Sequence, residues 1–336
     1  HRQHRQRTRT PVTHQRRRSR ATDMAYSEVV PSALAGERID RVVAMITGAS
    51  RTRVTEWLEQ GLVTLGGTLV TTRSRRVAVD DVIVIDVELD LGPAPLIAEP
   101  DIDVPIVYVD DDVIVLDKPA GLVVHPGAGN ATGTLVQAML ALYPELASIG
   151  EPGRPGVVHR LDKDTSGLML MARSQDAYVE LSSMLAAHEV ERTYLTLVWG
   201  LPEAGSGLVD APIGRSTREP TRMVVSAQGR EARTRYTVLE TFEEPEPCAL
   251  VECRLETGRT HQIRVHMSAI GHAVVGDDRY RGARKAITTP RIFLHSAALE
   301  FDHPVRLDER LEFVSELPED LDEVLVRLRN PTPTAE

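Results

Sequence analysis

The sequence has little of what defines secreted, disulfide-stabilised or membrane-spanning proteins. Two cysteines among 336 residues are too few for the disulfide framework of a small secreted domain. No apolar run approaches the roughly 18 residues of a membrane span, and no apolar segment follows the N-terminal arginines as in a signal peptide. Aromatic residues make up 4%, although 42% hydrophobic residues are enough for a core. We therefore expect a cytoplasmic protein of one large or two ordinary domains, with no membrane partner.

Acidic residues outnumber basic ones outside the N-terminus. Residues 1–20 contain eight arginines and no acid, whereas the remaining 316 residues carry 31 lysines and arginines against 49 acids, a net charge of −18. Phosphate contacts dominate nucleic-acid affinity, so an RNA-binding protein with this balance must gather its positive charge in a local cleft. The low-complexity segment 1–24 predicts either a disordered basic arm that binds RNA or a non-native extension upstream of the first foldable segment.

Residues 36–90 have the pattern of a compact unit. Apolar residues in 39–46 recur at i, i+3, i+4 and i+7, which predicts an amphipathic helix. Ser50 is a suitable N-cap for a second helix. A short hairpin with Gly66-Gly67 as its turn is expected next, followed by a strand over 82–87.

Residues 91–105 contain four prolines, which is typical of an extended linker. We place a second domain at 106–325 and a tail at 326–336. Within this domain several neighbouring strand patterns are accompanied by few helical ones, one of them over 176–187 with Ser174 as its cap. This predicts a largely antiparallel sheet and an α+β fold class.

The segment 156–167, Gly-Val-Val-His-Arg-Leu-Asp-Lys-Asp-Thr-Ser-Gly, is the most informative part of the chain. The apolar pair Val157-Val158 is followed by charged and hydroxyl residues and then by the apolar run 168–171. Asp162 is therefore predicted in a loop between two strands, where a reactive carboxylate is commonly placed. The alternative is an Asx-turn, in which a side chain of the loop bonds its own backbone.

The order His-Arg-Leu-Asp-Lys-Asp-Thr-Ser-Gly resembles the active-site motif of the pseudouridine synthases that modify large-subunit ribosomal RNA. Segments 192–200 and 255–266 resemble the family's tyrosine strand and its third motif. Segments 118–121 and 124–127 resemble the strand and loop that open the catalytic domain. The helix, helix and hairpin of 36–90 resemble the S4 RNA-binding module.

The resemblance implies a bent, mainly antiparallel sheet crossed by an RNA cleft, and it assigns roles to several residues. Asp162 corresponds to the catalytic aspartate and Arg264 to the cation that would keep it ionised. Tyr194 would stack on the target base and take part in the late removal of the C5 proton. Because uridine in folded RNA must be extruded to react, Arg160 would fill the vacated space or hold the extruded phosphate.

Further motif residues are expected to contact the substrate, namely His159, Arg259, His261 and Ile263. Arg51 and Arg53 are expected at the start of the second S4-like helix, where outward backbone N–H groups also favour phosphate. Each of these residues also has an ordinary structural explanation. The arginine pair can be solvated, Tyr194 can be a core aromatic, and Arg264 can be an exposed strand residue.

Isomerisation of uridine breaks the N1–C1′ bond, turns the uracil and rejoins it through C5, so it consumes neither redox equivalents nor phosphoryl energy. The sequence has no P-loop, dinucleotide fingerprint or metal-ligand spacing, and we expect no cofactor and no metal. The aspartate could attack C1′ or C6, or promote a glycal-type elimination.

Two other functions are compatible with the sequence. A metal-dependent RNA hydrolase would use His159, Asp162 and Asp164, with His261 and His266. A non-catalytic ribosome-assembly factor would keep the S4-like unit and a basic cleft without needing a catalytic carboxylate. The resemblance favours isomerisation of uridines in 23S ribosomal RNA, in the stem-loop that faces the decoding region. We also expect a monomeric enzyme.

Overall fold

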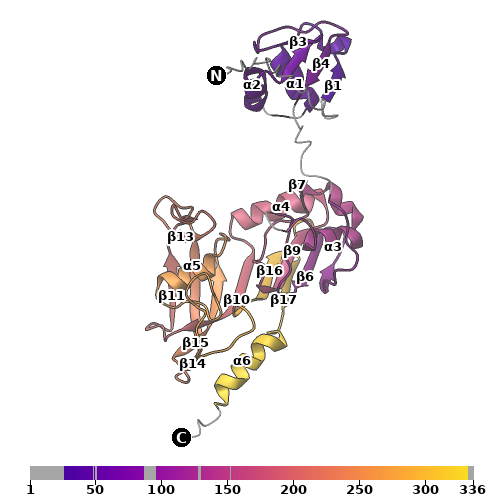
Figure 1. Cartoon of the computed structure of the whole chain (residues 1–336). Coiled ribbons are helices and arrows are strands. Elements are labelled where there is room, and N and C mark those ends of the chain that lie inside the picture. The colour runs from indigo at the N-terminus through magenta and orange to yellow at the C-terminus, as the bar shows by residue number, and fades with distance from the viewer. Residues whose placement is uncertain are drawn as a thin grey trace, which may run out of the picture. The chain divides into compact units, whose positions relative to one another are not determined.

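The computed structural model describes residues 26–47, 49, 51–86, 96–127, 130–151 and 153–331, and it divides into two compact units, residues 1–93 and 94–336 (Figure 1). The predicted N-terminal arm, the cap at Ser50, the first part of the linker and the last residues of the tail lie outside the described residues. Among the helices that are described, none is long and apolar enough to cross a membrane.

The first unit packs two helices against a small antiparallel sheet with the strand order β1-β4-β2-β3. Its elements are β1 (Tyr26–Val29), the 3-10 helix η1 (Ser32–Leu34), α1 (Ile39–Thr47), α2 (Arg51–Glu59), β2 (Val63–Leu65), β3 (Thr68–Leu69) and β4 (Val82–Ile85). Both predicted helices are confirmed, and their apolar faces meet the strands in one core. Gly66 and Gly67 have φ values of 55° and 75°, which the tight turn between β2 and β3 requires.

The second unit is built on a sheet of nine described strands, with few helices around it (Figure 1). The sheet contains β5 (Ile106–Val109), β6 (Val113–Lys118), β9 (Ser166–Ala172), β10 (Glu191–Trp199), β11 (Ser206–Asp210), β14 (Arg233–Phe242), β15 (Cys248–Leu255), β16 (Leu294–Asp302) and β17 (Arg310–Val314). The order is β11-β14-β15-β10-β16-β9-β6-β5, and β17 also pairs with β16. Only β9 and β16 run parallel among these pairs, so the predicted α+β class with a mainly antiparallel sheet is confirmed.

The remaining elements of the second unit are short strands and helices that flank this sheet. They are α3 (Leu135–Leu142), the 3-10 helix η2 (Pro144–Ser148), β7 (Gly150–Glu151), β8 (Arg154–Pro155), α4 (Gln175–Ala186), β12 (Ile213–Arg215), β13 (Met223–Val225), α5 (Gln262–Ala269) and α6 (Glu319–Arg329). The predicted cap of α4 is confirmed, because the Ser174 hydroxyl accepts a hydrogen bond from the Ala177 N–H at 3.1 Å.

The parallel contact between β9 and β16 explains the glycine that ends the segment 156–167. Gly167 pairs with Ser296 and has a φ of 110°, and a Cβ at this position would collide with the Ser296 backbone. Glycine therefore allows the two strands to approach. Because β9 begins at Ser166, this pairing fixes one end of the loop that carries Asp162.

The structure corrects the strand predicted before Asp162. Val157 and Val158 form no strand, and a single bridge joins Val157 to Met171. Both valines are partly buried, and each packs against a different core cluster. A two-residue apolar run is too short to distinguish a strand from a loop that lies over a core.

The second unit also differs from the boundaries predicted at residues 106 and 325. Leu96, Ile102 and Val104, from the predicted linker, pack against its core. At the other end α6 continues to Arg329, and Leu328 is buried. Prolines restrict φ without preventing burial, so a proline-rich segment can still lie against a core.

Candidate active site

Asp162 lies in the loop between β8 and β9 and lines a cavity of about 720 Å³ in the second unit. A backbone hydrogen bond closes the loop, from the Thr165 N–H to the Asp162 carbonyl at 3.2 Å. The carboxylate is 22% exposed, so it is accessible from the cavity while most of its surface is shielded. This confirms the loop placement and gives the carboxylate a fixed backbone.

Lys118 stabilises the same loop through a hydrogen bond to its backbone. It is fully buried at the end of β6, and its ammonium group donates to the backbone carbonyls of Pro119, Leu122 and Lys163 at 2.8, 2.9 and 3.0 Å. Burial lowers the pKa of Lys118 to about 8, against the opposing influence of nearby acids. The bond to Lys163, the residue after Asp162, ties the loop to the sheet.

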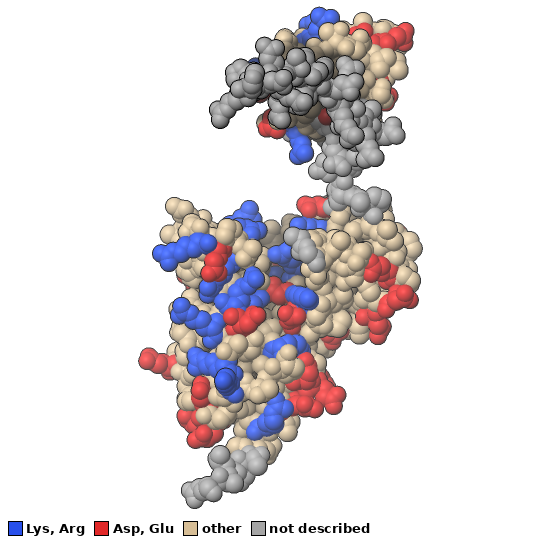
Figure 2. Space-filling model, viewed as in Figure 1, with Lys and Arg blue, Asp and Glu red and all other residues tan. Residues whose placement is uncertain are grey.

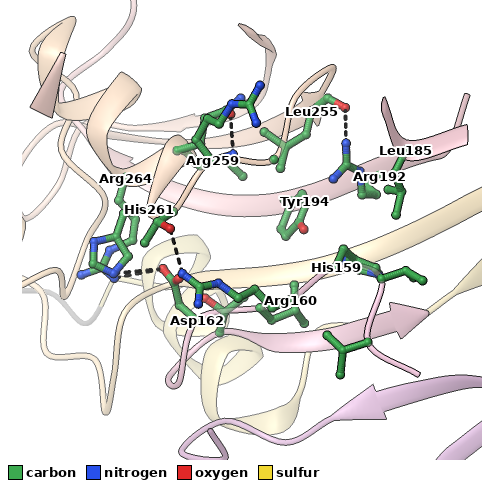
Figure 3. A pocket seen from close by; sticks show the side chains of 18 of the residues that line it. His159, Arg160, Asp162, Leu185, Arg192, Tyr194, Leu255, Arg259, His261 and Arg264 are labelled. Atoms are coloured by element: carbon green, nitrogen blue, oxygen red, sulfur yellow. Dashed lines mark hydrogen bonds and ion pairs between the residues drawn. The ribbon is translucent and has the colours of Figure 1, made fainter. Parts of the chain in front are cut away.

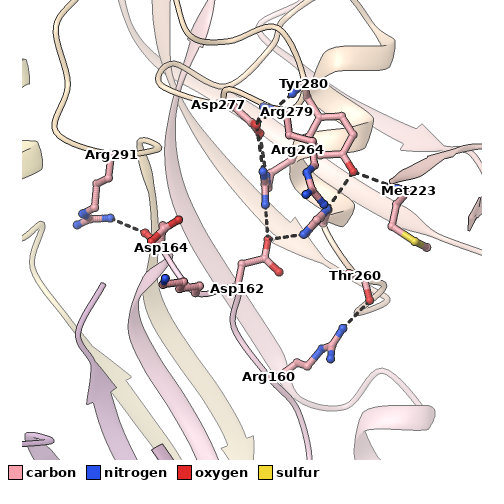
Figure 4. Close-up of polar contacts among 12 residues, drawn as sticks. Arg160, Asp162, Asp164, Met223, Thr260, Arg264, Asp277, Arg279, Tyr280 and Arg291 are labelled. Atoms are coloured by element: carbon pink, nitrogen blue, oxygen red, sulfur yellow. Dashed lines mark hydrogen bonds and ion pairs between the residues drawn. The ribbon is translucent and has the colours of Figure 1, made fainter. Parts of the chain in front are cut away.

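Arg264 approaches Asp162 from α5, the helix formed by the third motif. Its Nη1 donates to Asp162 Oδ2 at 3.0 Å. Its Nε and Nη2 donate to the two carboxylate oxygens of Asp277 at 2.7 and 3.0 Å (Figure 4). The third motif therefore continues into a helix, and Arg264 is a helical residue rather than an exposed strand residue.

Two carboxylates keep Arg264 charged. Burial disfavours its cation, but the hydrogen bonds from Asp277 and the charges of Asp162 and Asp277 outweigh burial and raise the pKa of Arg264. The Asp277 side chain is fully buried, and its Oδ1 also accepts the backbone N–H groups of Arg279 and Tyr280. Asp277 thus fixes the plane of the guanidinium from behind, leaving Nη1 directed at Asp162.

His261 completes the polar surroundings of Asp162. It precedes α5 with a left-handed backbone, φ 58°. Its Nδ1 lies 2.9 Å from the Tyr280 hydroxyl, and its Nε2 lies 3.8 Å from Asp162 Oδ2. Burial lowers the pKa of His261, although the charge of Asp162 opposes the shift. The arrangement favours a neutral imidazole beside an aspartate that Arg264 already neutralises.

Tyr194 lies in the same cavity, on the central strand β10 between β15 and β16. The side chain is 5% exposed. Figure 3 shows its ring between the Asp162–Arg264 pair at one end of the cavity and Arg192 at the other. Burial raises the pKa of the Tyr194 hydroxyl, with the charge of Arg192 opposing the shift. The predicted aspartate, arginine and tyrosine are therefore brought together around one cavity.

Comparison with known proteins identifies this arrangement. The sequence profile of the RNA pseudouridylate synthase family matches residues 112–269, and that of the S4 domain matches residues 37–83. An uncharacterised RNA pseudouridine synthase of Bacillus subtilis is 43% identical over 87% of this chain and 94% of its own length. The chain belongs to the RNA pseudouridylate synthase family.

Other relatives and solved structures agree. The ribosomal large subunit pseudouridine synthases D of Xanthomonas campestris and Vibrio cholerae are 43% and 39% identical, over 91% and 92% of this chain and 93% and 96% of their own lengths. The human RNA pseudouridylate synthase domain containing 1 covers 71% of this chain and all of its own, at 26% identity and a TM-score of 0.51. The human domain containing 4 covers 67% of this chain and 93% of its own, at 26% identity and a TM-score of 0.52.

In this synthase, His159 supports the loop. Its Nε2 accepts a hydrogen bond from the backbone N–H of Leu170 at 2.9 Å, while the ring lines the cavity. Burial, followed by the charge of Arg192, lowers the pKa of His159 to about 3. The imidazole is therefore neutral, and one of its nitrogens is occupied by β9.

The other predicted substrate contacts lie around the mouth and wall of the cavity. Arg160 is exposed, and its Nη2 donates to the Thr260 hydroxyl at 2.8 Å, which links the aspartate loop to the third motif (Figure 4). Arg259 donates to the Glu231 carbonyl at 2.9 Å, and Ile263 is buried in the wall.

Positive charge gathers around this cavity despite the acidic composition. Figure 2 shows blue side chains over one face of the second unit, with most red ones toward its edges. The cavity lining includes five outer arginines, Arg154, Arg160, Arg215, Arg230 and Arg259, against two acids, Glu151 and Asp162. The local basic cleft expected from the charge balance is present.

The residues required by a metal-dependent hydrolase do not form a ligand set. Within the described residues, the group with metal-ligand spacing is Asp110, Asp112 and His303, which is a different set from the one the hydrolase needs. Both ring nitrogens of His266 contact protein oxygens, Thr234 Oγ1 and the Ala211 carbonyl, each at 2.9 Å.

Sequence reasoning missed Asp277 and Arg192. Asp277 follows an apolar run and a glycine, Ala273 to Gly276, as a loop acid that could have been recognised in the same way as Asp162. Arg192 opens the tyrosine strand two residues before Tyr194, so strand alternation could have placed it on the same face.

Proposed function

We propose that this synthase converts specific uridines of large-subunit ribosomal RNA to pseudouridine, with Asp162 as the reacting carboxylate. The observation that carries the proposal is the hydrogen-bonded pair of Asp162 and Arg264, 3.0 Å apart beside Tyr194 in a basic cavity. The relatives named for the ribosomal large subunit, similar over nearly their whole length, support this RNA as the substrate.

Asp162 would act while ionised, either at C1′, at C6, or as the base of an elimination. Arg264 supports this role because it supplies a positive charge with a fixed direction and cannot itself deprotonate at neutral pH. Asp277 holds Arg264 in that direction through two hydrogen bonds. The pair is thus preorganised before the substrate enters.

Tyr194 would stack on the extruded uracil. Its ring is buried in the cavity wall, and stacking on an aromatic ring contributes about 1–3 kcal/mol per base. The raised pKa keeps the hydroxyl protonated at neutral pH, which supports stacking over direct removal of the C5 proton as its main role.

The outer arginines would hold the RNA backbone while the nucleotide is extruded. Arg160 stands at the mouth of the cavity beside Asp162, where it could hold the extruded phosphate or replace the base in the stack. Arg259, His261 and Ile263 would shape the cavity around the nucleotide. In the first unit, Arg51 at the start of α2 and Arg53, both exposed, would contact phosphates that position the enzyme.

A direct test is to incubate the purified protein with unmodified large-subunit RNA and separate the resulting nucleosides by chromatography. Pseudouridine should appear, and EDTA should not prevent it once the RNA is folded. Loss of product with EDTA would favour a metal-dependent enzyme. If the protein binds the RNA but leaves it unmodified, an assembly factor would be favoured. Mapping pseudouridines in ribosomal RNA of cells with and without the gene identifies the positions.

The reacting carboxylate, its arginine and the tyrosine already meet in a cavity lined by the second unit. We therefore propose a monomer as the active form. Sedimentation of the protein at the assay concentration tests it, because a dimer would give about twice the mass of 37.0 kDa.

A further inference from the structure

Arg192 is a buried arginine without a carboxylate partner. Its side chain lines the active-site cavity, and the residue is 5% exposed. Its one hydrogen bond among the described residues is a long one, 3.5 Å from Nη2 to the Leu255 carbonyl, and its Nε has no partner. Burial lowers the pKa of Arg192.

Arg192 differs from Arg264, another arginine of the same cavity, in having no carboxylate partner among the described residues. Arg264 is neutralised by two carboxylates, whereas no described acid forms an ion pair with Arg192. An unpaired charge in a protein interior costs free energy that a neutral side chain would not. Gly258 nevertheless leaves space for the Arg192 side chain, because a Cβ at Gly258 would lie only 2.7 Å from Arg192 Nη1.

The position of Arg192 defines what it can reach. It stands two residues before Tyr194 on the same face of β10, and Asp162 lies at the opposite end of the cavity (Figure 3). A uridine that stacks on Tyr194 with its sugar toward Asp162 turns another edge of its ring toward Arg192. Uracil carries two carbonyl oxygens at its edges, and both accept hydrogen bonds.

A second polar group in the cavity also lacks a partner. Thr165, three residues after Asp162, is 2% exposed, and its hydroxyl makes no hydrogen bond. Four buried side-chain atoms without a partner are found in the described residues, and those of Thr165 and Arg192 both belong to residues that line this cavity. Buried polar groups are nearly always hydrogen-bonded, so these two groups are available to a polar molecule that enters the cavity.

We propose that Arg192 binds a carbonyl oxygen of the target uracil and stabilises the negative charge that develops on the base during isomerisation. This inference rests on the proposed function. The guanidinium would act as a preorganised positive charge that is itself largely shielded from solvent, where such charges contribute most. The outer arginines would contact the RNA backbone instead.

The reaction delivers negative charge to the uracil by every available route. When the N1–C1′ bond breaks, its electron pair stays on the base and spreads from N1 to O2 and O4. The C1′ centre then bonds to an Asp162 oxygen, or loses its neighbouring C2′ proton to the carboxylate. If the carboxylate instead adds to C6, the electron pair of the C5–C6 double bond moves to O4 as an enolate. When C5 bonds to C1′, the bond from C1′ to Asp162 breaks, or in the elimination route the carboxylate returns the proton to C2′. In the C6 route the carboxylate also leaves C6. C5 then loses its proton and N1 gains one, which gives neutral pseudouridine.

The first test compares Arg192→Met with Arg230→Met, which changes an exposed arginine at the cavity mouth. Arg192→Met should lower the single-turnover rate at saturating RNA by about 100- to 1,000-fold, while its Kd for RNA stays within about threefold of the parent. Arg230→Met should show the reverse pattern, a weaker Kd and a nearly parental saturating rate. A weaker Kd with an unchanged saturating rate for Arg192→Met would overturn the proposal.

Thermal unfolding separates this role from a structural one. Removing an unpaired buried charge should leave the Tm of Arg192→Met equal to or above that of the parent, although activity is lost. A Tm that falls together with the rate would show that Arg192 acts through the fold. Arg192→Lys gives a further readout, since burial should lower the pKa of the introduced amine and make its residual activity fall as pH rises.

A test with modified RNA shows whether Arg192 contacts the uracil base or a phosphate. RNA with uncharged methylphosphonate linkages beside the target uridine should still show the full rate difference between the parent and Arg192→Met. Disappearance of the difference would assign Arg192 to a phosphate and reject the proposal. A parent protein that forms no pseudouridine would reject the proposed function itself, whereas an active parent with an equally active Arg192→Met variant rejects only this inference.

Discussion

Arg264 lies 102 residues after Asp162 in the chain, and its Nη1 stands 3.0 Å from Oδ2 of that carboxylate. The opposite edge of the guanidinium is held by Asp277, which is buried. The arginine therefore has its direction fixed by the protein, and only one edge is left for the reacting group. Electrostatic stabilisation of this kind needs no rearrangement when the substrate arrives.

Asp162→Asn should abolish pseudouridine formation and leave the fold intact. The amide keeps the shape of the carboxylate but provides neither a negative charge nor a nucleophilic oxygen. Product from large-subunit RNA, counted by nucleoside chromatography, should fall by at least about 1,000-fold. Asp164→Asn is the matched control, because Asp164 is an exposed acid of the same loop, and it should stay within a few-fold of the parent. A tenth of the parent rate in Asp162→Asn would remove Asp162 from the reacting role.

Arg264→Leu should lose stability as well as activity, because it leaves the buried Asp277 without its counter-charge. Breaking such a pair costs about 3–5 kcal/mol of unfolding free energy. The double variant Arg264→Leu/Asp277→Asn removes both charges but keeps an oxygen for the backbone N–H groups of Arg279 and Tyr280. It should recover much of that loss, yet remain inactive. Urea unfolding and single-turnover assays provide the two readouts. Recovery of activity in the double variant would show that Arg264 serves the fold alone.

Tyr194→Phe should keep the affinity for RNA within about twofold, because base stacking needs the ring and not the hydroxyl. Tyr194→Leu should weaken it by about 1–3 kcal/mol, a factor of roughly 5 to 150. Binding is best measured in the Asp162→Asn background, so that the RNA remains unmodified. Equal affinity of the leucine and phenylalanine variants would contradict the stacking role.

The stability of the enzyme should fall as pH is lowered from about 6.5 toward 3. The pKa of His159 is about 3 in the folded state, below its ordinary value of 6.5, so in this window the unfolded chain binds a proton that the folded chain does not. His159→Gln, whose amide oxygen can accept the Leu170 N–H, should show a shallower dependence in urea unfolding.

His188→Asn provides the control for this pH dependence. His188 is an exposed histidine with a positive φ, which asparagine tolerates. This variant should keep the steep parental dependence. An identical pH dependence in His159→Gln and the parent would show that other groups govern stability in this range.

Removal of residues 1–93 should leave a folded second unit with its cavity, because this unit is compact and its core residues and cavity lining all lie beyond this segment. The truncated enzyme should modify short stem-loops but discriminate poorly among sites in full-length RNA. Loss of the phosphate contacts expected of Arg51 and Arg53 should also flatten the salt dependence of binding. Rates and Kd values at several salt concentrations, on both substrates, provide the measurement. Loss of activity on short stem-loops as well would mean that the first unit is part of the catalytic fold.

Local patterns predicted the parts of this protein that depend on neighbours in the chain. The apolar stripe of α1 and the cap at Ser174 are set within a few residues, so these elements were predicted with nearly the observed ends. The short pair Val157-Val158 was predicted wrongly, because two apolar residues carry no period. The loop that holds Asp162 was found because an unusual order of charged residues interrupts the apolar pattern.

The sequence by itself determined the family, the reacting aspartate and the types of most elements, since each depends on a contiguous string of residues. Only the tertiary structure decided which charges meet. Asp277 and Arg264 pair across the end of α5, and Arg192 is left without an acid, although all three look alike as polar residues in the sequence. The cause is physical. Burial and pairing are properties of residues brought together by the sheet from distant parts of the chain, and no local period records them.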